Sequence, residues 1–222
     1  CTRDAVPFPG FISMTNFFCF GQRDFDIFSK QNHLIENYIP VGSLVGGYYK
    51  TQVSRGRVKK EYDICFISQT SKKELYGNYN VDSFYGRYNS SLVDVQFMLF
   101  DYLKKYIQET DCRMVVCLRS DSKDEAKIYK DLISDKCTII YNDRQNFSTY
   151  RAVEQSEMTI SLFSTVLADV FSWGSKVLYA NLLNNEWFET PEAGISYFSK
   201  NDYVEFRKKV DELLNMDIDE YR

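Results

Sequence analysis

The stretch YDICFIS, residues Tyr62–Ser68, is the segment that decides the fold. It is a short, almost uninterrupted apolar run, which is typical of a strand covered on both faces in a parallel sheet. Four similar runs follow, separated by stretches with a helical spacing of apolar residues. These further strands are predicted over Arg113–Leu118, Cys137–Tyr141, Met158–Leu162 and Lys176–Ala180. The alternation predicts an α/β fold with a Rossmann-like, doubly wound parallel sheet and helices on both faces.

The segments around and after these strands are predicted to be helices or loops. Helices are expected over Leu92–Glu109, Glu125–Ser134, Asn146–Gln155, Ser164–Trp173 and Asn201–Leu214. Ser148 is expected to cap the third helix, and Gly174 to end the fourth in a left-handed conformation. The polar stretch Gln69–Ser90 is rich in Gly, Asn, Ser and Tyr, and we predict a long loop there.

The N-terminal segment does not follow this rhythm. Phe11–Phe20 is an apolar, aromatic run, Asp24–Asn32 is predicted to be helical, and Tyr38–Val41 follows. We therefore expect two parts. Residues 1–60 would be an extension left from a preceding domain, with its interdomain crossover, and residues 61–222 a Rossmann-like nucleotide-binding domain.

Composition excludes several classes of protein. A net charge of −4 with only short basic runs disfavours a nucleic-acid partner. No apolar stretch has the length of a membrane span. The six cysteines have no zinc-ligand spacing, and His33 is the single histidine. We expect a reduced, cytoplasmic protein without a metal, held at the inner face of the membrane, if at all, by other assembly proteins.

The best candidate for a ligand site is the loop between the fourth strand and its helix, Ser161–Thr165. In an open parallel sheet, ligands bind beyond the carboxyl ends of the strands. A helix start leaves backbone N–H groups that suit a diphosphate, and the hydroxyls of Ser164 and Thr165 could add hydrogen bonds. N-capping explains the same hydroxyls equally well. Asp169, one turn further, could hold a ribose or sugar hydroxyl, or simply complement the helix dipole.

A second candidate follows the second and third strands. Arg119 and Ser120 come directly after one strand, and Arg144 and Tyr150 follow the next. Arg119 could clamp a phosphate through two hydrogen bonds, although exposed loop arginines are as common. Arg144 could face the same site, and Tyr150 could stack on a ligand or pack inside.

Gly42 and Ser43 form a third candidate, in the N-terminal segment. Their backbone could approach an anion, whereas a plain turn explains them as well. The chain has neither a dinucleotide-binding fingerprint nor a P-loop.

One combination of motifs resembles a known family. Ser164-Thr165 with Asp169, followed by Gly174 and Lys176, resembles the C-terminal half of GT-B glycosyltransferases of bacterial surface-polysaccharide biosynthesis. Similar families are the capsule and lipopolysaccharide transferases, including Kdo transferases, and the CDP-glycerol glycerophosphotransferases. In these families a Ser-Thr-x-x-x-acidic segment followed by Gly-x-Lys-x-Val begins the donor-binding helix. Here Asp169 stands where Glu is more usual.

The resemblance implies transfer of a sugar from a nucleotide-activated donor to a glycan acceptor. No acidic pair signals a bound divalent metal, so we expect chemistry without a metal or a separate cofactor. The predicted donor and phosphate contacts are Ser161, Phe163, Ser164, Thr165, Val166, Asp169, Arg119, Ser120, Arg144, Tyr150, Gly42 and Ser43. Arg119-Ser120 stands where a His-Pro pair is frequent in those families, and we expect the N-terminal domain that supplies their acceptor site to be largely absent from these 222 residues.

Two other interpretations remain open. The first is a non-catalytic module that binds a nucleotide or glycan, or interacts with other proteins. The second is a flavodoxin-like regulatory domain, which is disfavoured because no acidic cluster follows Ser68.

Overall fold

The chain forms two compact units, Cys1–Ser54 and Arg55–Arg222. The structure is a computed structural model and describes residues 12–31, 33–54, 56, 58–69, 84–119, 123–132, 136–185 and 188–222. Each unit has its own parallel sheet.

The larger unit is built on a six-stranded sheet in which every neighbouring pair is parallel. Its strands are β3 (Tyr62–Ile67), β4 (Met114–Cys117), β5 (Cys137–Ile140), β6 (Ser156–Ser161), β7 (Lys176–Ala180) and β8 (Tyr197–Phe198). Their spatial order is β5-β4-β3-β6-β7-β8. This is the order of the dinucleotide-binding folds, so the prediction of a Rossmann-like doubly wound sheet is confirmed.

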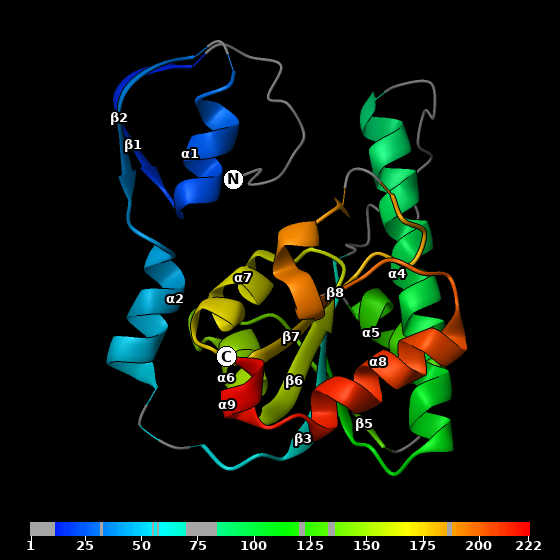
Figure 1. Cartoon of the computed structure of the whole chain (residues 1–222). Coiled ribbons are helices and arrows are strands. Elements are labelled where there is room, and N and C mark those ends of the chain that lie inside the picture. The colour runs from blue at the N-terminus through cyan, green and yellow to red at the C-terminus, as the bar shows by residue number, and fades with distance from the viewer. Residues whose placement is uncertain are drawn as a thin grey trace. The chain divides into compact units, whose positions relative to one another are not determined.

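Helices cover both faces of this sheet (Figure 1). On one face lie α4 (Phe84–Glu109), α5 (Lys123–Leu132) and α8 (Tyr203–Asn215), and on the other lie α6 (Ser148–Glu154) and α7 (Thr165–Ser172). Alternate residues of β3 explain why both faces are apolar. Phe66 packs into the first core cluster and Cys65 into the second, because side chains alternate along a strand.

One predicted helix begins earlier than the pattern indicated, and three short elements in the described part of the larger unit were not predicted. Helix α4 begins at Phe84, so the C-terminal part of the loop predicted over Gln69–Ser90 is helical; residues 70–83 lie outside the described residues. One glycine in a long helix costs only about 1 kcal/mol, so Gly86 does not prevent it. The last predicted helix is followed by a further short one, α9 (Ile218–Tyr221), and the short η3 (Pro191–Ser196) and β8 were not predicted.

Helix ends were predicted with mixed success. Gly174 follows α7 with a φ of +71°, which confirms the left-handed stop. The cap predicted at Ser148 is wrong, because Phe147 holds the cap position with a φ of 53° and no side-chain hydrogen bond. The Ser148 hydroxyl instead donates to the carbonyl of Tyr141 (2.9 Å) and accepts from the N–H of Asp143 (2.8 Å).

The smaller unit contains two parallel strands, β1 (Ser13–Cys19) and β2 (Leu34–Pro40), joined by α1 (Gln22–Phe28). The short helices α2 (Leu44–Tyr48) and η1 (Tyr49–Val53) follow. Phe28 lies on Phe17 of β1, with ring centroids 4.9 Å apart. Parallel sheets ordinarily have more strands than this one and are covered on both faces. The origin of this unit in a preceding domain stays a prediction.

Among the described residues, no helix combines the length and the apolar character that crossing a membrane requires.

Candidate functional site

The topology places a switch point between β3 and β6, the two central strands of the large sheet. The chain leaves β3 toward β4 and leaves β6 toward β7, and ligands of such sheets bind beyond the carboxyl ends at that point. Ser161, the last residue of β6, is fully buried, and its hydroxyl donates to the carbonyl of Ile67 at the end of β3 (2.7 Å). Ser161 therefore ties the two strand ends together.

The start of α7 follows immediately, and Ser164 caps it. The Ser164 hydroxyl accepts from the N–H of Val166 (3.3 Å), and its carbonyl accepts from the N–H of Leu167 (2.9 Å). The capping interpretation is confirmed for this residue. The N–H groups of Val166 and Leu167 therefore already have acceptors within the protein. Thr165 is exposed, and it is the residue of this turn most open to a ligand.

The Phe163 ring lies next to this turn and packs against other apolar side chains of the protein. Its ring stacks on Phe188 with centroids 5.0 Å apart and planes 14° from parallel. Both rings pack with Leu92 of α4 and with Leu162, so this loop is held against α4.

Asp169 and Tyr150, predicted separately from the sequence, are brought together by the fold. The Tyr150 hydroxyl donates to the Asp169 carboxylate at 2.6 Å, and Asp169 is only 4% exposed. A buried carboxylate needs such donors, because an unsatisfied one is costly. The pair links α6 to α7, and contact of either residue with a sugar remains a prediction.

A buried polar network that the sequence did not reveal lies at the carboxyl ends of β3 and β4. The Ser68 hydroxyl donates to the Glu125 carboxylate (2.7 Å) and lies 3.0 Å from the Tyr129 hydroxyl. The side-chain amide of Gln96 donates to the same Tyr129 hydroxyl (2.9 Å). All four side chains are at most 1% exposed. Because each hydroxyl has one proton, the donations run from Gln96 through Tyr129 and Ser68 to Glu125.

The network also reaches the backbone of the loops around the switch point. The Gln96 amide oxygen accepts from the N–H of Gln69 (3.2 Å), and Glu125 accepts from the N–H of Arg119 (3.4 Å). The only indication in the sequence was that Gln96 and Glu125 are polar residues beside the apolar Val95 and Ala126. Polar residues inside a helix are usually assigned to its solvent face, so this indication is weak.

Arg119 joins the loops after β3 and β4. Its guanidinium donates to the carbonyl of Gln69 (2.7 Å), and its own carbonyl accepts from the Asn142 side chain (2.8 Å). The residue is exposed, and a guanidinium has five N–H donors, so Arg119 can contact several groups at once. Ser120, its predicted companion, lies outside the described residues.

The remaining predicted contacts are more distant or belong to the other unit. Arg144 is exposed and follows β5, two strands from β3, which corresponds to about 10 Å across the sheet. In the smaller unit, Gly42 has a φ of +68°, and the Ser43 hydroxyl caps α2 by accepting from the N–H of Gly46 (3.0 Å). Both residues thus have the local roles of a turn and a helix cap.

The second half of the family-like motif has a structural role. Lys176 begins β7, at the edge opposite to the carboxyl ends, and is buried. Its ammonium donates to the carbonyl of Leu214 in the last turn of α8 (3.0 Å), where a cation complements the helix dipole.

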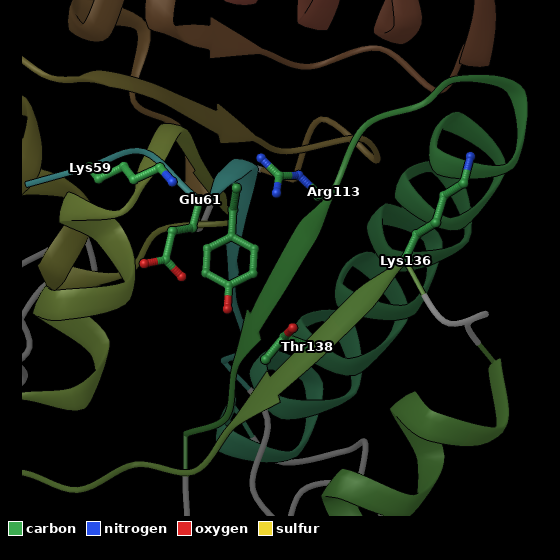
Figure 2. Close-up of a pocket in the computed structure, with 6 residues that line it drawn as sticks. Lys59, Glu61, Arg113, Lys136 and Thr138 are labelled. Atoms are coloured by element: carbon green, nitrogen blue, oxygen red, sulfur yellow. The ribbon is translucent and has the colours of Figure 1, made fainter.

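A hollow of about 560 Å³ lies at the amino edge of the sheet, where the strands begin (Figure 2). It is lined by Lys59, Glu61, Tyr62, Arg113, Lys136 and Thr138, and we call it the amino-edge hollow. Within the described ranges, no group of three or more His, Cys, Asp or Glu side chains could hold a metal ion.

Comparison with known proteins relates the chain to one family. A family model described as "putative O-antigen biosynthesis protein" matches residues 13–217, which include elements of both units. No curated protein and no solved structure matches the chain. The match supports surface-polysaccharide biosynthesis, the process that the motifs indicated. Because it covers nearly the whole chain, this protein belongs to that O-antigen biosynthesis family.

Proposed function

We propose that this protein binds a nucleotide-activated sugar at the carboxyl edge of its large sheet and takes part in transferring the sugar to a surface glycan. The observation that carries the proposal is the strand order, which has its switch point between β3 and β6. Exposed Thr165 and exposed Arg119 follow the two strands on either side of β3. Membership in the O-antigen family supports the process.

The proposed chemistry depends on stabilising the charge of the leaving nucleotide. A diphosphate gains charge as the bond to the sugar breaks, and preorganised donors lower the barrier most there. The start of α7 would supply its partial positive charge and the Thr165 hydroxyl. Arg119 would supply a guanidinium that Gln69 already orients, with Arg144 reaching in from the side of β5. The proposal assigns this positive charge to arginines rather than to a divalent metal.

A second candidate function is binding without transfer, by this chain as a module of an assembly complex. One observation favours it: the two buried carboxylates near this edge, Asp169 and Glu125, accept hydrogen bonds from the hydroxyls of Tyr150 and Ser68. Neither is thereby oriented to remove a proton from an acceptor hydroxyl. In this alternative the base that activates the acceptor belongs to another domain or protein.

Calorimetric titration with CDP-, UDP-, GDP- and CMP-sugars tests both candidates. Saturable binding of at least one donor is expected. Binding of none of them would contradict both the transferase and the nucleotide-binding module. If a donor binds, the release of nucleotide with and without lipopolysaccharide acceptor distinguishes transfer from simple binding.

The substitution Thr165→Trp tests where the donor binds. A bulky indole at the first residue of α7 should abolish donor binding and leave thermal unfolding unchanged, because Thr165 is exposed. Val204→Trp is the matched control, since Val204 is 71% exposed in the first turn of α8. Donor affinity that survives Thr165→Trp, or that is lost equally in Val204→Trp, would move the site away from α7.

A further inference from the structure

In the amino-edge hollow, charged side chains at or near several strand starts share a cavity. Tyr62, Arg113 and Thr138 stand at or next to the starts of β3, β4 and β5. A strand of six residues such as β3 is about 20 Å long, so this hollow lies about that far from the proposed donor site. Its volume, about 560 Å³, falls within the range of small-molecule sites.

Two of the charged side chains of the hollow, Glu61 and Lys136, have partners within the protein. The carboxylate of Glu61 accepts from the Gln155 side-chain amide (3.1 Å). The ammonium of Lys136 donates to the carbonyl of Thr110 (2.8 Å) and forms an ion pair with Asp111, and Figure 2 shows it turned away from Arg113.

The two other cations have no such partner among the residues that the structure describes. Arg113 donates its backbone N–H to Asp63 (2.7 Å), but within the described part of the chain its guanidinium makes no hydrogen bond or ion pair. The ammonium of Lys59 likewise makes no hydrogen bond or ion pair within that part of the chain. Because Lys136 is paired with the Asp111 carboxylate (3.2 Å), the remaining charges of the lining are Arg113, Lys59 and one carboxylate, Glu61, which leaves an excess of positive charge.

The rest of the lining suits a sugar ring. Tyr62 is half-buried and packs against the second core cluster, so its ring is held in place beside the cations. Thr138 adds an exposed hydroxyl. An immobilised aromatic ring offers an apolar surface with a polar rim, and a hydroxyl can pair with the hydroxyls of a saccharide.

We propose that the amino-edge hollow binds an anionic saccharide, in which a carboxylate or phosphate pairs with Arg113 and Lys59 and the sugar ring lies against Tyr62. A guanidinium pairs with both kinds of anion through two parallel hydrogen bonds. In a protein of O-antigen biosynthesis this hollow would hold a stretch of glycan apart from the donor site. The inference does not depend on nucleotide binding, so either proposal can fail alone.

Amide chemical shifts of the ¹⁵N-labelled protein test the inference. The probes are D-glucuronate, D-glucose 6-phosphate, D-glucose and inorganic phosphate. The expected result is saturable shifts at Tyr62, Arg113 and Thr138 with one or both anionic sugars, and at least about tenfold weaker binding of glucose and of phosphate. Which anionic sugar binds better identifies the charged group.

Matched variants locate the binding. Arg113→Ala should weaken the anionic sugar about tenfold, the equivalent of losing one charge-assisted pair of about 1.4 kcal/mol. Lys59→Ala should weaken it less, and Lys208→Ala, at an exposed lysine of α8, should leave it unchanged. The inference is overturned if no anionic sugar shifts these amides, if glucose or phosphate alone binds as tightly, or if Arg113→Ala keeps full affinity.

Discussion

At the carboxyl edge of the large sheet the polar side chains bind one another, whereas at the amino edge two cations bind no side chain in the described part of the molecule. Ser68 and Glu125 are joined by a hydrogen bond of 2.7 Å and are almost completely buried. Arg113 and Lys59 stand exposed in a hollow. The carboxyl edge uses its polar groups to order the backbone, whereas the amino edge leaves Arg113 and Lys59 exposed to solvent.

The difference shows that a polar residue at the expected edge is not automatically a ligand contact. Ser161 and Ser164 occupy the loop where a ligand is expected, and both hydroxyls are already used within the protein. What the carboxyl edge offers a ligand is an ordered backbone with Thr165 and Arg119 beside it. The network would then act by positioning these groups.

The largest effect is expected from Glu125→Ala, which breaks the network at its acceptor. Removing a fully buried carboxylate leaves the Ser68 hydroxyl without its acceptor and opens a cavity, so the free energy of unfolding should fall by about 2–4 kcal/mol. Urea unfolding measures the loss. Glu157→Ala, at an exposed glutamate of β6, should change stability by less than about 0.5 kcal/mol. Equal losses in the two variants would mean that the network does not hold this edge.

Tyr150→Phe should have a smaller effect at the same edge. It deletes only the hydroxyl that donates to buried Asp169, and a hydrogen bond to a charged group contributes about 1.5–3 kcal/mol. The free energy of unfolding should therefore fall by about 1–2 kcal/mol after partial relaxation. Tyr141→Phe, at a tyrosine that is 39% exposed, is the control and should be nearly neutral. A neutral Tyr150→Phe would show that other donors satisfy Asp169.

The sequence predicts the sheet well because its signals are local. Each of the longer strands is an apolar run, and β7 has the predicted bounds, Lys176–Ala180. The right-handed crossover rule then leaves few possible strand orders. The two-residue strand β8 was missed, because a pair of residues is too short to show any periodicity.

The site is predicted less well because its contacts join distant segments. The edge loop at Ser164 follows from the strand–helix pattern alone. The bond from Ser161 to Ile67 spans 94 positions, and that from Ser68 to Glu125 spans 57. Nothing in either segment indicates its partner. The amino-edge hollow has the same origin, since three strand starts that are far apart in the chain form it.

Alkaline unfolding examines the amino edge beside the hollow. Burial raises the pKa of the Cys137 thiol, at the start of β5, from 9.0 to about 12. The folded thiol therefore keeps its proton where the unfolded one has lost it. The stabilisation is complete below pH 9 and is lost as the pH rises toward 12.

Urea unfolding of the wild type and Cys137→Ala at pH 6, 8 and 10 measures this contribution. Between pH 8 and 10 the free energy of unfolding of the wild type should fall by about 1 kcal/mol more than that of the variant. Between pH 6 and 8 the two changes should be parallel. An identical alkaline fall in both proteins would mean that solvent reaches this thiol and that the edge is more open than the structure indicates.

The smallest effect is expected from Arg113→Ala, and it tests the comparison most directly. The Arg113 side chain is exposed and its guanidinium has no partner in the described residues, so its removal should change the free energy of unfolding by less than about 0.5 kcal/mol. The hydrogen bond from its backbone to Asp63 is retained by alanine. A loss comparable to that of Glu125→Ala would show that both edges use their charges for stability, and the hollow would then have no group to spare for a ligand.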